Sequence, residues 1–201
     1  REAFFIAASG RPGPVLVDVP KDIQQAVTEY EPATPRQIKP YFHESEYVDR
    51  AVELINAAKR PVMYVGGGCV ISGASEELVE VSEKMDIPVA CSMMGLGCFP
   101  ASHPNFMGMI GMHGKANVAE ALEEADLIIA IGCRFDDRVA GDRKNFCKQA
   151  KIVHIDIDLA ELGKNVKPDV AVMADAKLAL RAMLPRLKKQ TDGSWIKHRR
   201  E

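Results

Sequence analysis

Two periods of apolar residues divide most of the chain into helices and strands. Apolar positions spaced three and four residues apart predict helices at residues 45–58, 74–85, 115–124 and 177–187. Short apolar runs predict strands at residues 62–65, 87–91, 127–131, 152–157 and 170–173. The run Leu127–Ile131 has no polar position, which is typical of a central parallel strand that is covered on both faces.

Strands and helices alternate after residue 60. This order predicts a parallel sheet whose crossover connections are right-handed. We therefore predict an α/β fold, namely a doubly wound, mostly parallel, six-stranded sheet of the Rossmann-like kind. In such a sheet, ligands bind beyond the carboxyl ends of the strands, so the loops that follow the strands are the first places to search for function.

The first 44 residues follow a different pattern. Residues 2–14 predict the end of a helix and a sharp turn, and the apolar run Val15–Val19 predicts a buried strand. Pro32, Pro35 and Pro40, with few apolar residues in any period, predict an extended linker. We expect the chain to be part of a longer protein, because it opens inside an element. The predicted divisions are the end of a preceding domain at 1–28, a linker at 29–44, a central domain at 45–188 and a second linker at 189–201.

The composition is that of a soluble globular protein. Of 201 residues, 47% are apolar and 27% are charged, and no apolar run approaches the roughly 18–20 residues of a membrane span. The net charge of -2 argues against a nucleic-acid groove, and the basic tail Lys197–Arg200 fits a solvated chain end. Five cysteines, without C-x-x-C spacing, indicate reduced thiols and a cytoplasmic compartment. We therefore expect no nucleic-acid partner and no membrane partner.

Distinctive loops follow the first two strands of the predicted sheet. Gly66, Gly67 and Gly68 come directly after the first strand, where backbone without a Cβ atom can approach a diphosphate closely. Because their spacing departs from G-x-G-x-x-G, a plain turn is the alternative. After the second strand, Met93 and Met94 either cover a flat aromatic ring or fill the core.

Polar side chains follow the later strands. His113 lies among three glycines ahead of a helix, as either a ligand contact or a polar residue at a helix start. Residues 132–139 hold two arginines and two carboxylates after a buried strand, and we favour contacts to ribose or ribityl hydroxyls and phosphate over a solvated loop. Asp156 and Asp158 end the next strand, where an acidic residue accepts ribose hydroxyls, and Asp175 ends the last one.

No residue of this chain is predicted to be catalytic or to bind a metal. The five histidines are scattered, and no His, Asp or Glu pair has i, i+4 spacing on a helix at the ligand edge. No serine or cysteine stands in a nucleophile elbow near an acid, so His113 has nothing to activate as a base. The residues themselves favour a dinucleotide-binding domain.

Three motifs, taken in order, resemble the catalytic subunits of the acetohydroxyacid synthase family, which is also called acetolactate synthase. They are Ser9–Asp22, with the sequence SGRPGPVLVDVPKD, then Gly111–Gly114 and Arg134–Val139. The resemblance covers essentially the whole chain, although other thiamine-diphosphate enzymes share the first motif in a looser form. It implies the central domain of a thiamine-diphosphate enzyme, preceded by the tail of a pyrimidine-binding domain.

The resemblance also implies an FAD site. Members of the family carry FAD across this central domain, in a role regarded as structural because their reaction has no net redox change. Most of the implied contacts lie in the loops described above. Carried over position by position, the residues that line the FAD are Arg11, Gly66, Gly67, Gly68, Ser92, Met93, Gly111, Met112, His113, Gly132, Arg134, Asp136, Arg138, Val139, Asp156, Ile157, Glu161, Asp175 and Ala176.

For the parent protein, the resemblance implies a transferase of branched-chain amino-acid biosynthesis that depends on thiamine diphosphate and Mg²⁺. Such an enzyme decarboxylates pyruvate and joins the two-carbon unit to pyruvate or 2-oxobutyrate. It implies a homodimer or tetramer, with a regulatory small subunit as a candidate partner. The glutamate that activates thiamine and the Gly-Asp-Gly motif that binds metal and diphosphate belong to domains outside this chain. We therefore expect the chain alone to be inactive.

Two other interpretations compete with this one. Glyoxylate carboligase and oxalyl-CoA decarboxylase have central domains of the same fold, but the string Arg134–Arg138 argues against both. A non-catalytic flavin-binding module is the second alternative. The segment Gly10–Asp22 argues against it, because such a module does not need the end of a different domain.

Overall fold

The structure is a computed structural model that describes residues 1–43, 45–142, 145–190 and 193–195. Contacts divide the chain into one unit at Arg1–Tyr41 and a second unit that starts at Phe42. Most of the predicted second linker, including the basic tail Lys197–Arg200, lies outside the described residues. The two units are considered separately.

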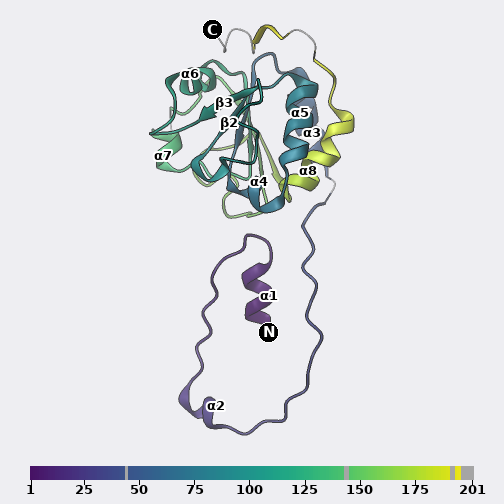
Figure 1. Ribbon diagram of the computed structural model, residues 1–201, viewed down its shortest axis with the longest axis vertical. Coiled ribbons are helices and arrows are strands. Elements are labelled where there is room, and N and C mark those ends of the chain that lie inside the picture. Colours follow the sequence, from purple (N-terminus) through teal and green to yellow (C-terminus); the bar gives the residue numbers. More distant parts are fainter. Residues whose placement is uncertain (44, 143–144, 191–192, 196–201) are drawn as a thin grey trace. The chain divides into compact units, whose positions relative to one another are not determined.

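The second unit is built on one parallel sheet (Figure 1). Every neighbouring pair of strands is parallel, which confirms the predicted doubly wound α/β class. The spatial order of the six strands is β3-β2-β1-β4-β5-β6. Their bounds are β1 (Pro61–Val65), β2 (Val89–Cys91), β3 (Phe106–Met109), β4 (Leu127–Ile131), β5 (Lys151–Asp156) and β6 (Val170–Met173).

The order of the strands defines a switch point between β1 and β4. From β1 the chain proceeds outward through β2 to β3, and from β4 it proceeds in the opposite direction through β5 to β6. Open α/β sheets bind their ligands at the carboxyl ends of the strands beside such a switch point. We call the surface formed by the loops after all six strands the carboxyl edge.

Helices cover both faces of the sheet. Side chains of α3 (Glu46–Ala57), α5 (Ser75–Met85) and α8 (Ala176–Met183) share one buried core with alternate residues of the strands. These three helices lie together in Figure 1. Side chains of α6 (Ala116–Glu124) and α7 (Asp137–Ala140) share the second core with the intervening strand residues. The two-sided cover explains why β4 is buried at every position.

Two short elements and an early helix end differ from the predicted pattern. The loop after β1 continues directly into α4 (Gly67–Ser72), and the loop after β2 contains the 3₁₀ turn η1 (Met93–Gly95). Helix α8 ends at Met183 and passes into η2 (Leu184–Arg186), earlier than the predicted end at residue 187. Pro185 lacks the N–H that would continue the helix, which accounts for this end.

The first unit contains α1 (Glu2–Ala8) and α2 (Lys21–Gln25). The predicted strand Val15–Val19 is wrong, because these residues form no strand and Leu16 is 88% exposed. An isolated strand leaves its backbone groups without partners, and residues 1–41 contain no other strand for it to pair with. Residues 29–43 form no helix or strand, and the division into domains stays a prediction.

Candidate functional site

The structure gathers nearly all of the predicted ligand residues at the carboxyl edge. Parallel strands end at the same side of a sheet, so the loops after β1 to β6 meet there. Arg11 is the exception, since it belongs to the first unit, and its part in a site stays a prediction. The gathered residues, in spatial order across the sheet, are Gly111, Met112 and His113, then Ser92 and Met93, then Gly66, Gly67 and Gly68, then Gly132, Arg134, Asp136, Arg138 and Val139, then Asp156, Ile157 and Glu161, and finally Asp175 and Ala176.

Close backbone packing explains two of the three glycines after β1. A Cβ atom on Gly66 would lie 2.2 Å from the carbonyl oxygen of Gly132, and a Cβ atom on Gly68 would lie 2.7 Å from the Cα atom of Gly132. Gly132 itself has a φ of +56°, which favours glycine. The loops after β1 and β4 thus touch backbone to backbone at the switch point. This packing requires glycine whether or not a ligand is present.

In the same packing, two of the three glycine amides that could bind phosphate already donate hydrogen bonds to backbone carbonyls. The N–H of Gly66 donates to Ile131 at 2.9 Å, and the N–H of Gly68 donates to Gly132 at 2.9 Å. The N–H of Gly67 makes no backbone hydrogen bond within the described part of the chain. Gly67 is therefore the amide of this loop that is best placed to receive a phosphate oxygen.

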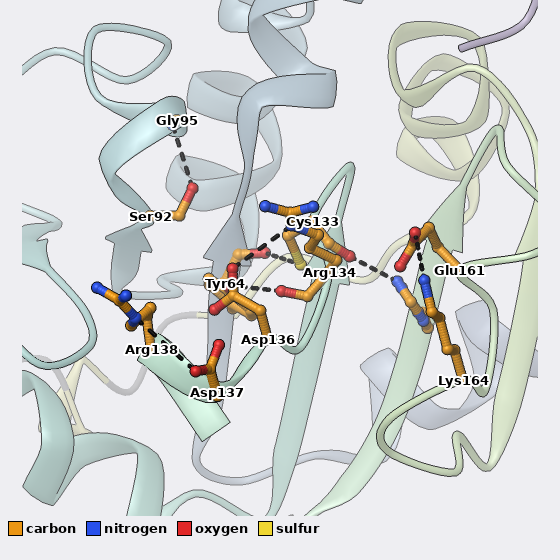
Figure 2. Close-up of polar contacts among 11 residues, drawn as sticks. Tyr64, Ser92, Gly95, Cys133, Arg134, Asp136, Asp137, Arg138, Glu161 and Lys164 are labelled. Atoms are coloured by element: carbon orange, nitrogen blue, oxygen red, sulfur yellow. Dashed lines mark hydrogen bonds and ion pairs between the residues drawn. The ribbon is translucent and has the colours of Figure 1, made fainter. Parts of the chain in front are cut away.

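The loop after β4, residues 132–139, carries most of the charge at the switch point, and we call it the switch loop. Arg134 and Asp136 form an ion pair with 3.4 Å between Nε and Oδ2 (Figure 2). The other carboxylate oxygen of Asp136, Oδ1, is buried and has no hydrogen-bond partner among the described residues. Arg138 and the neighbouring Asp137 are both largely exposed and lie 3.8 Å apart.

An unpaired buried carboxylate oxygen is energetically costly. Leaving such an atom without a donor costs on the order of 1–3 kcal/mol, and more when the group is charged. A ligand hydroxyl placed beside Asp136 would supply the missing donor. The arrangement therefore fits a polyol ligand, which was one of the contacts that the sequence predicted for this loop.

Two residues that the sequence did not predict, Tyr64 and His154, hold the backbone of the switch loop. The Oη atom of Tyr64 on β1 donates to the carbonyl of Arg134 at 3.3 Å (Figure 2). The Nε2 atom of His154 on β5 lies 2.8 Å from the carbonyl of Cys133. Phe135 packs edge-on against both, with ring centroids 5.6 Å from Tyr64 and 5.2 Å from His154. The loop is therefore anchored on both sides of β4.

The loop after β3 contacts the switch loop directly. The N–H of Met112 donates to the carbonyl of Arg138 at 2.8 Å. Gly111 has a φ of +102°, and a Cβ atom on it would lie 2.7 Å from the same carbonyl oxygen. His113 is exposed beside them. This contact joins two of the predicted ligand loops into one surface, while the role of His113 stays a prediction.

The methionines after β2 do not fill the core, so that alternative is wrong. Met93 is 63% exposed and Met94 is 75% exposed, and both belong to η1. The turn is fixed by Ser92, whose Oγ accepts a hydrogen bond from the N–H of Gly95 at 3.2 Å (Figure 2). Two flexible thioethers on a fixed turn present an apolar surface that suits a flat ring.

The carboxylates after β5 and β6 have structural hydrogen bonds. Asp156 accepts from the N–H of Asp158 at 2.9 Å, which shapes the turn that follows β5. Asp175 caps α8 by accepting from the N–H of Leu178 at 3.1 Å. Glu161 is buried and accepts from Lys164 at 3.0 Å. Each carboxylate has a second oxygen, so these bonds leave the predicted ligand contacts untested.

Three features bear on other kinds of site. No group of three or more His, Cys, Asp or Glu side chains is arranged to hold a metal ion in the part of the chain that the structure describes. Within the same residues, no helix has the length and apolar character needed to cross a bilayer. All five cysteines are buried and form no disulfide, and burial raises the pKa of the thiols of Cys69 and Cys133.

A depression lies at the opposite side of the sheet, away from the carboxyl edge. We call it the amino-edge cavity; it has a volume of about 1030 Å³ and is lined by residues 56–61, 85–86, 123–124, 149, 190 and 193–195. None of the residues predicted to bind a ligand lines it. Because ligands of open α/β sheets bind at the carboxyl ends of the strands, the switch point is the better candidate.

Burial lowers the pKa of His154 below its usual value of 6.5, although the carboxylates of Asp156 and Glu161 act in the opposite direction. The carbonyl of Cys133 can only accept, so the neutral ring donates through Nε2, while Nδ1 is buried without a partner among the described residues. Below pH 6.5 this histidine is largely protonated in the unfolded chain but stays neutral in the folded chain until the pH falls to its lowered pKa. The contribution of His154 to stability is therefore complete above pH 6.5 and is lost as the pH falls below it.

This linkage predicts a measurable pH dependence. Between pH 6.5 and 5, the free energy of unfolding should fall with a slope of up to about 1.4 kcal/mol per pH unit from this one group. His154→Gln should flatten that slope, because glutamine keeps a donor but does not titrate. Urea unfolding at several pH values checks this. An unchanged slope in the variant would show that His154 is not the titrating group.

The fold and the site together define a doubly wound α/β domain of the Rossmann type, with its polar loops at the switch point. The chain belongs to the family described as "thiamine pyrophosphate enzyme, central domain", whose family model matches residues 48–183. The predicted resemblance to a thiamine-diphosphate enzyme is thereby confirmed.

The chain is also similar to proteins named acetolactate synthase from three organisms. The chain is 46% identical to the probable acetolactate synthase large subunit of Methanococcus aeolicus, over 93% of this chain and 32% of the relative. It is 47% identical to acetolactate synthase 2, chloroplastic, of Zea mays, over 97% of this chain and 32% of the relative. It is 45% identical to the acetolactate synthase isozyme 1 large subunit of Escherichia coli, over 96% of this chain and 34% of the relative. The chain thus spans about a third of the length of these curated relatives.

Proposed function

We propose that the chain is the central domain of an acetolactate synthase and that its carboxyl edge binds FAD. The parent enzyme would join pyruvate to pyruvate or 2-oxobutyrate with thiamine diphosphate and Mg²⁺, both bound outside this chain. Identity of 45–47% to proteins named acetolactate synthase, over nearly the whole chain, supports the first part. The switch loop supports the second part.

The observation that carries the FAD proposal is the buried Oδ1 atom of Asp136, which has no hydrogen-bond partner among the described residues and lies beside the Arg134 side chain. FAD has a ribityl chain, whose hydroxyls donate, next to a diphosphate, whose oxygens accept. A carboxylate and a guanidinium side by side match this sequence of groups. NAD also has a diphosphate but has no linear polyol, so it would leave that part of the match unused.

The remaining loops fit the other parts of the molecule. The amide of Gly67, which donates to no carbonyl in the described part of the chain, lies where glycine lets the backbone approach a diphosphate. Met93 and Met112 are each 63% exposed and suit the faces of the isoalloxazine ring. Bound FAD would connect the loops of the carboxyl edge. In this proposal the chain's own residues bind and orient the FAD, and they take no part in the bond-making steps of the parent enzyme.

We expect Arg134→Ala to weaken FAD binding by about tenfold or more, since a charge-assisted hydrogen bond to phosphate is lost. The 201-residue chain is titrated into FAD, and the change in flavin fluorescence gives the dissociation constant. Arg50→Ala is the matched control, because Arg50 is an exposed arginine on α3 and its loss changes the net charge equally.

The result for the Arg50 variant should equal that for the unchanged chain. The same titration with NAD separates FAD from dinucleotides in general. Binding of NAD as tight as that of FAD, or equal binding by the Arg134 and unchanged chains, would overturn the FAD proposal.

The activity of the parent enzyme is tested with the full-length protein. Acetolactate formation from pyruvate should require thiamine diphosphate and Mg²⁺. The Arg134→Ala variant should lose this activity at low FAD concentration and regain it when FAD is in excess. A full-length protein that carboligates glyoxylate or decarboxylates oxalyl-CoA instead would contradict the assignment. Light scattering of the same sample tests the proposed homodimer or tetramer and, after addition of a small subunit, the regulatory partner. The cytoplasmic location also stays a proposal, since some relatives are named chloroplastic.

A further inference from the structure

A row of alternating large and small side chains crosses the centre of the sheet beneath the switch loop. In the register of the strands, Tyr64 on β1 pairs with Ala130 on β4, and Ala130 pairs with His154 on β5. Residues in register on neighbouring parallel strands point to the same face. Tyr64 and His154 therefore stand on the same face of the sheet, with only the methyl group of Ala130 between them.

Phe135 fills the space above Ala130. Strands two positions apart in a sheet are separated by roughly 9.5 Å. The ring of Phe135 lies 5.6 Å from that of Tyr64 and 5.2 Å from that of His154, as expected for a ring inserted between the two. All three side chains are buried. The residue between Arg134 and Asp136 is thus seated in a slot that the strands provide.

The two walls of the slot also hold the backbone of the loop. His154 donates to the carbonyl of Cys133 at 2.8 Å, and Tyr64 donates to the carbonyl of Arg134 at 3.3 Å. Burial raises the pKa of the Tyr64 hydroxyl, so this group keeps the proton that it donates. The carbonyls of two successive residues, Cys133 and Arg134, are therefore fixed by side chains from different strands.

We propose that Tyr64 and His154 are positioning residues that set the placement of Arg134 and Asp136 for the ligand. The inference rests on the proposed FAD function and deepens it. Neither ring touches the ligand; each acts through the carbonyl that it holds and through Phe135. A slot made only for packing would need no donors, and an apolar pair of similar size would avoid the cost of burying them.

The test separates positioning from general stability by pairing four variants. His154→Leu removes the donor, His154→Gln restores one, and Tyr64→Phe removes only the hydroxyl. Ser82→Ala is the matched control, because the hydroxyl of Ser82 is equally buried and donates to the carbonyl of Ile87 at 2.7 Å on the other side of the sheet. Each variant is measured twice, for FAD affinity and for thermal unfolding, with binding measured well below the melting temperature.

We expect His154→Leu to weaken FAD binding by about tenfold and Tyr64→Phe, whose bond is longer, by about threefold. His154→Gln should recover most of the affinity. Ser82→Ala should lower the melting temperature but change the dissociation constant by less than about twofold, since it is remote from the loop. Equal losses of affinity in His154→Leu and Ser82→Ala, or no rescue by His154→Gln, would overturn the inference.

A ligand-free measurement keeps this inference distinct from the FAD proposal. In the protein without ligand, His154→Leu should raise amide hydrogen exchange in residues 133–138 by about tenfold, while Ser82→Ala leaves this segment unchanged relative to global exchange. If FAD fails to bind but this difference appears, the FAD proposal fails and the positioning of the loop stands. If exchange in the loop does not respond to His154→Leu, the positioning inference fails whatever the ligand.

Discussion

Replacing Gly66 with alanine is expected to lower the free energy of unfolding of the second unit by about 3 kcal/mol or more. The added Cβ atom would lie 2.2 Å from the carbonyl oxygen of Gly132 and 2.5 Å from the Cβ atom of Cys133. Gly66 also donates to Ile131, so it cannot move away without breaking the ladder between β1 and β4. Both strands are at the centre of the sheet, and relief of the clash therefore disturbs the whole core.

Gly67→Ala is the matched control in the same loop. Its Cβ atom would lie 3.1 Å from the Cβ atom of Met94, so a shift of a few tenths of an ångström relieves the contact. We expect it to cost about 1 kcal/mol or less. Urea unfolding followed by circular dichroism measures both variants. Equal midpoints for the two would contradict the close packing of the loops after β1 and β4.

Replacing Phe135 with alanine is the second large effect, with an expected loss of about 3–5 kcal/mol in the free energy of unfolding. Phe135 is 2% exposed and packs against the rings of Tyr64, Phe146 and His154. Its removal would leave a cavity beneath the switch loop and free the segment that carries Arg134 and Asp136. FAD binding should weaken together with stability.

Phe99→Ala provides the comparison, because Phe99 is equally buried but belongs to the core on the other face. It should lose a similar amount of stability and, under conditions where both variants are folded, keep its affinity for FAD. Phe135→Leu gives a milder change if the alanine variant does not fold. A dissociation constant that depends only on stability, and not on which phenylalanine is replaced, would contradict the proposed role of Phe135 in the switch loop.

Much of the fold could be predicted from the sequence because the signals are local. β4 and β6 match their predicted bounds, and β1, β2 and β5 begin or end within two residues of theirs. Each of these strands is a short run of mainly branched apolar residues, a pattern typical of buried strands in a parallel sheet. Strand β3 was not located, because Phe106–Met109 contains a glycine with positive φ and its pairing with β2 shifts register. A glycine in a short run removes the apolar pattern on which the prediction depends.

The position of the site could be predicted from the sequence, but the residues that hold the switch loop in place could not. The loops at the carboxyl edge follow from the order of strands and helices alone. Tyr64 and His154 were missed because their partnership depends on the register of three strands, which no local pattern reveals. One signal existed in the sequence: His154 is the polar residue inside the otherwise apolar run Ile152–Ile155. For Gly66 and Gly68 the sequence predicted close approach of the backbone to a diphosphate, but not the packing against Gly132. That packing depends on which strand lies beside β1.

The measurement that tests the central claim most directly is a map of backbone amide shifts in the ¹⁵N-labelled chain as FAD is added. We predict that the largest shifts occur at residues 66–68, 92–93, 111–113 and 132–139, the loops that meet at the switch point. Residues 59–61 and 193–195, which line the amino-edge cavity, should not respond. Shifts concentrated at the amino-edge cavity, or spread evenly over the chain, would contradict the proposal that the carboxyl edge is the FAD site.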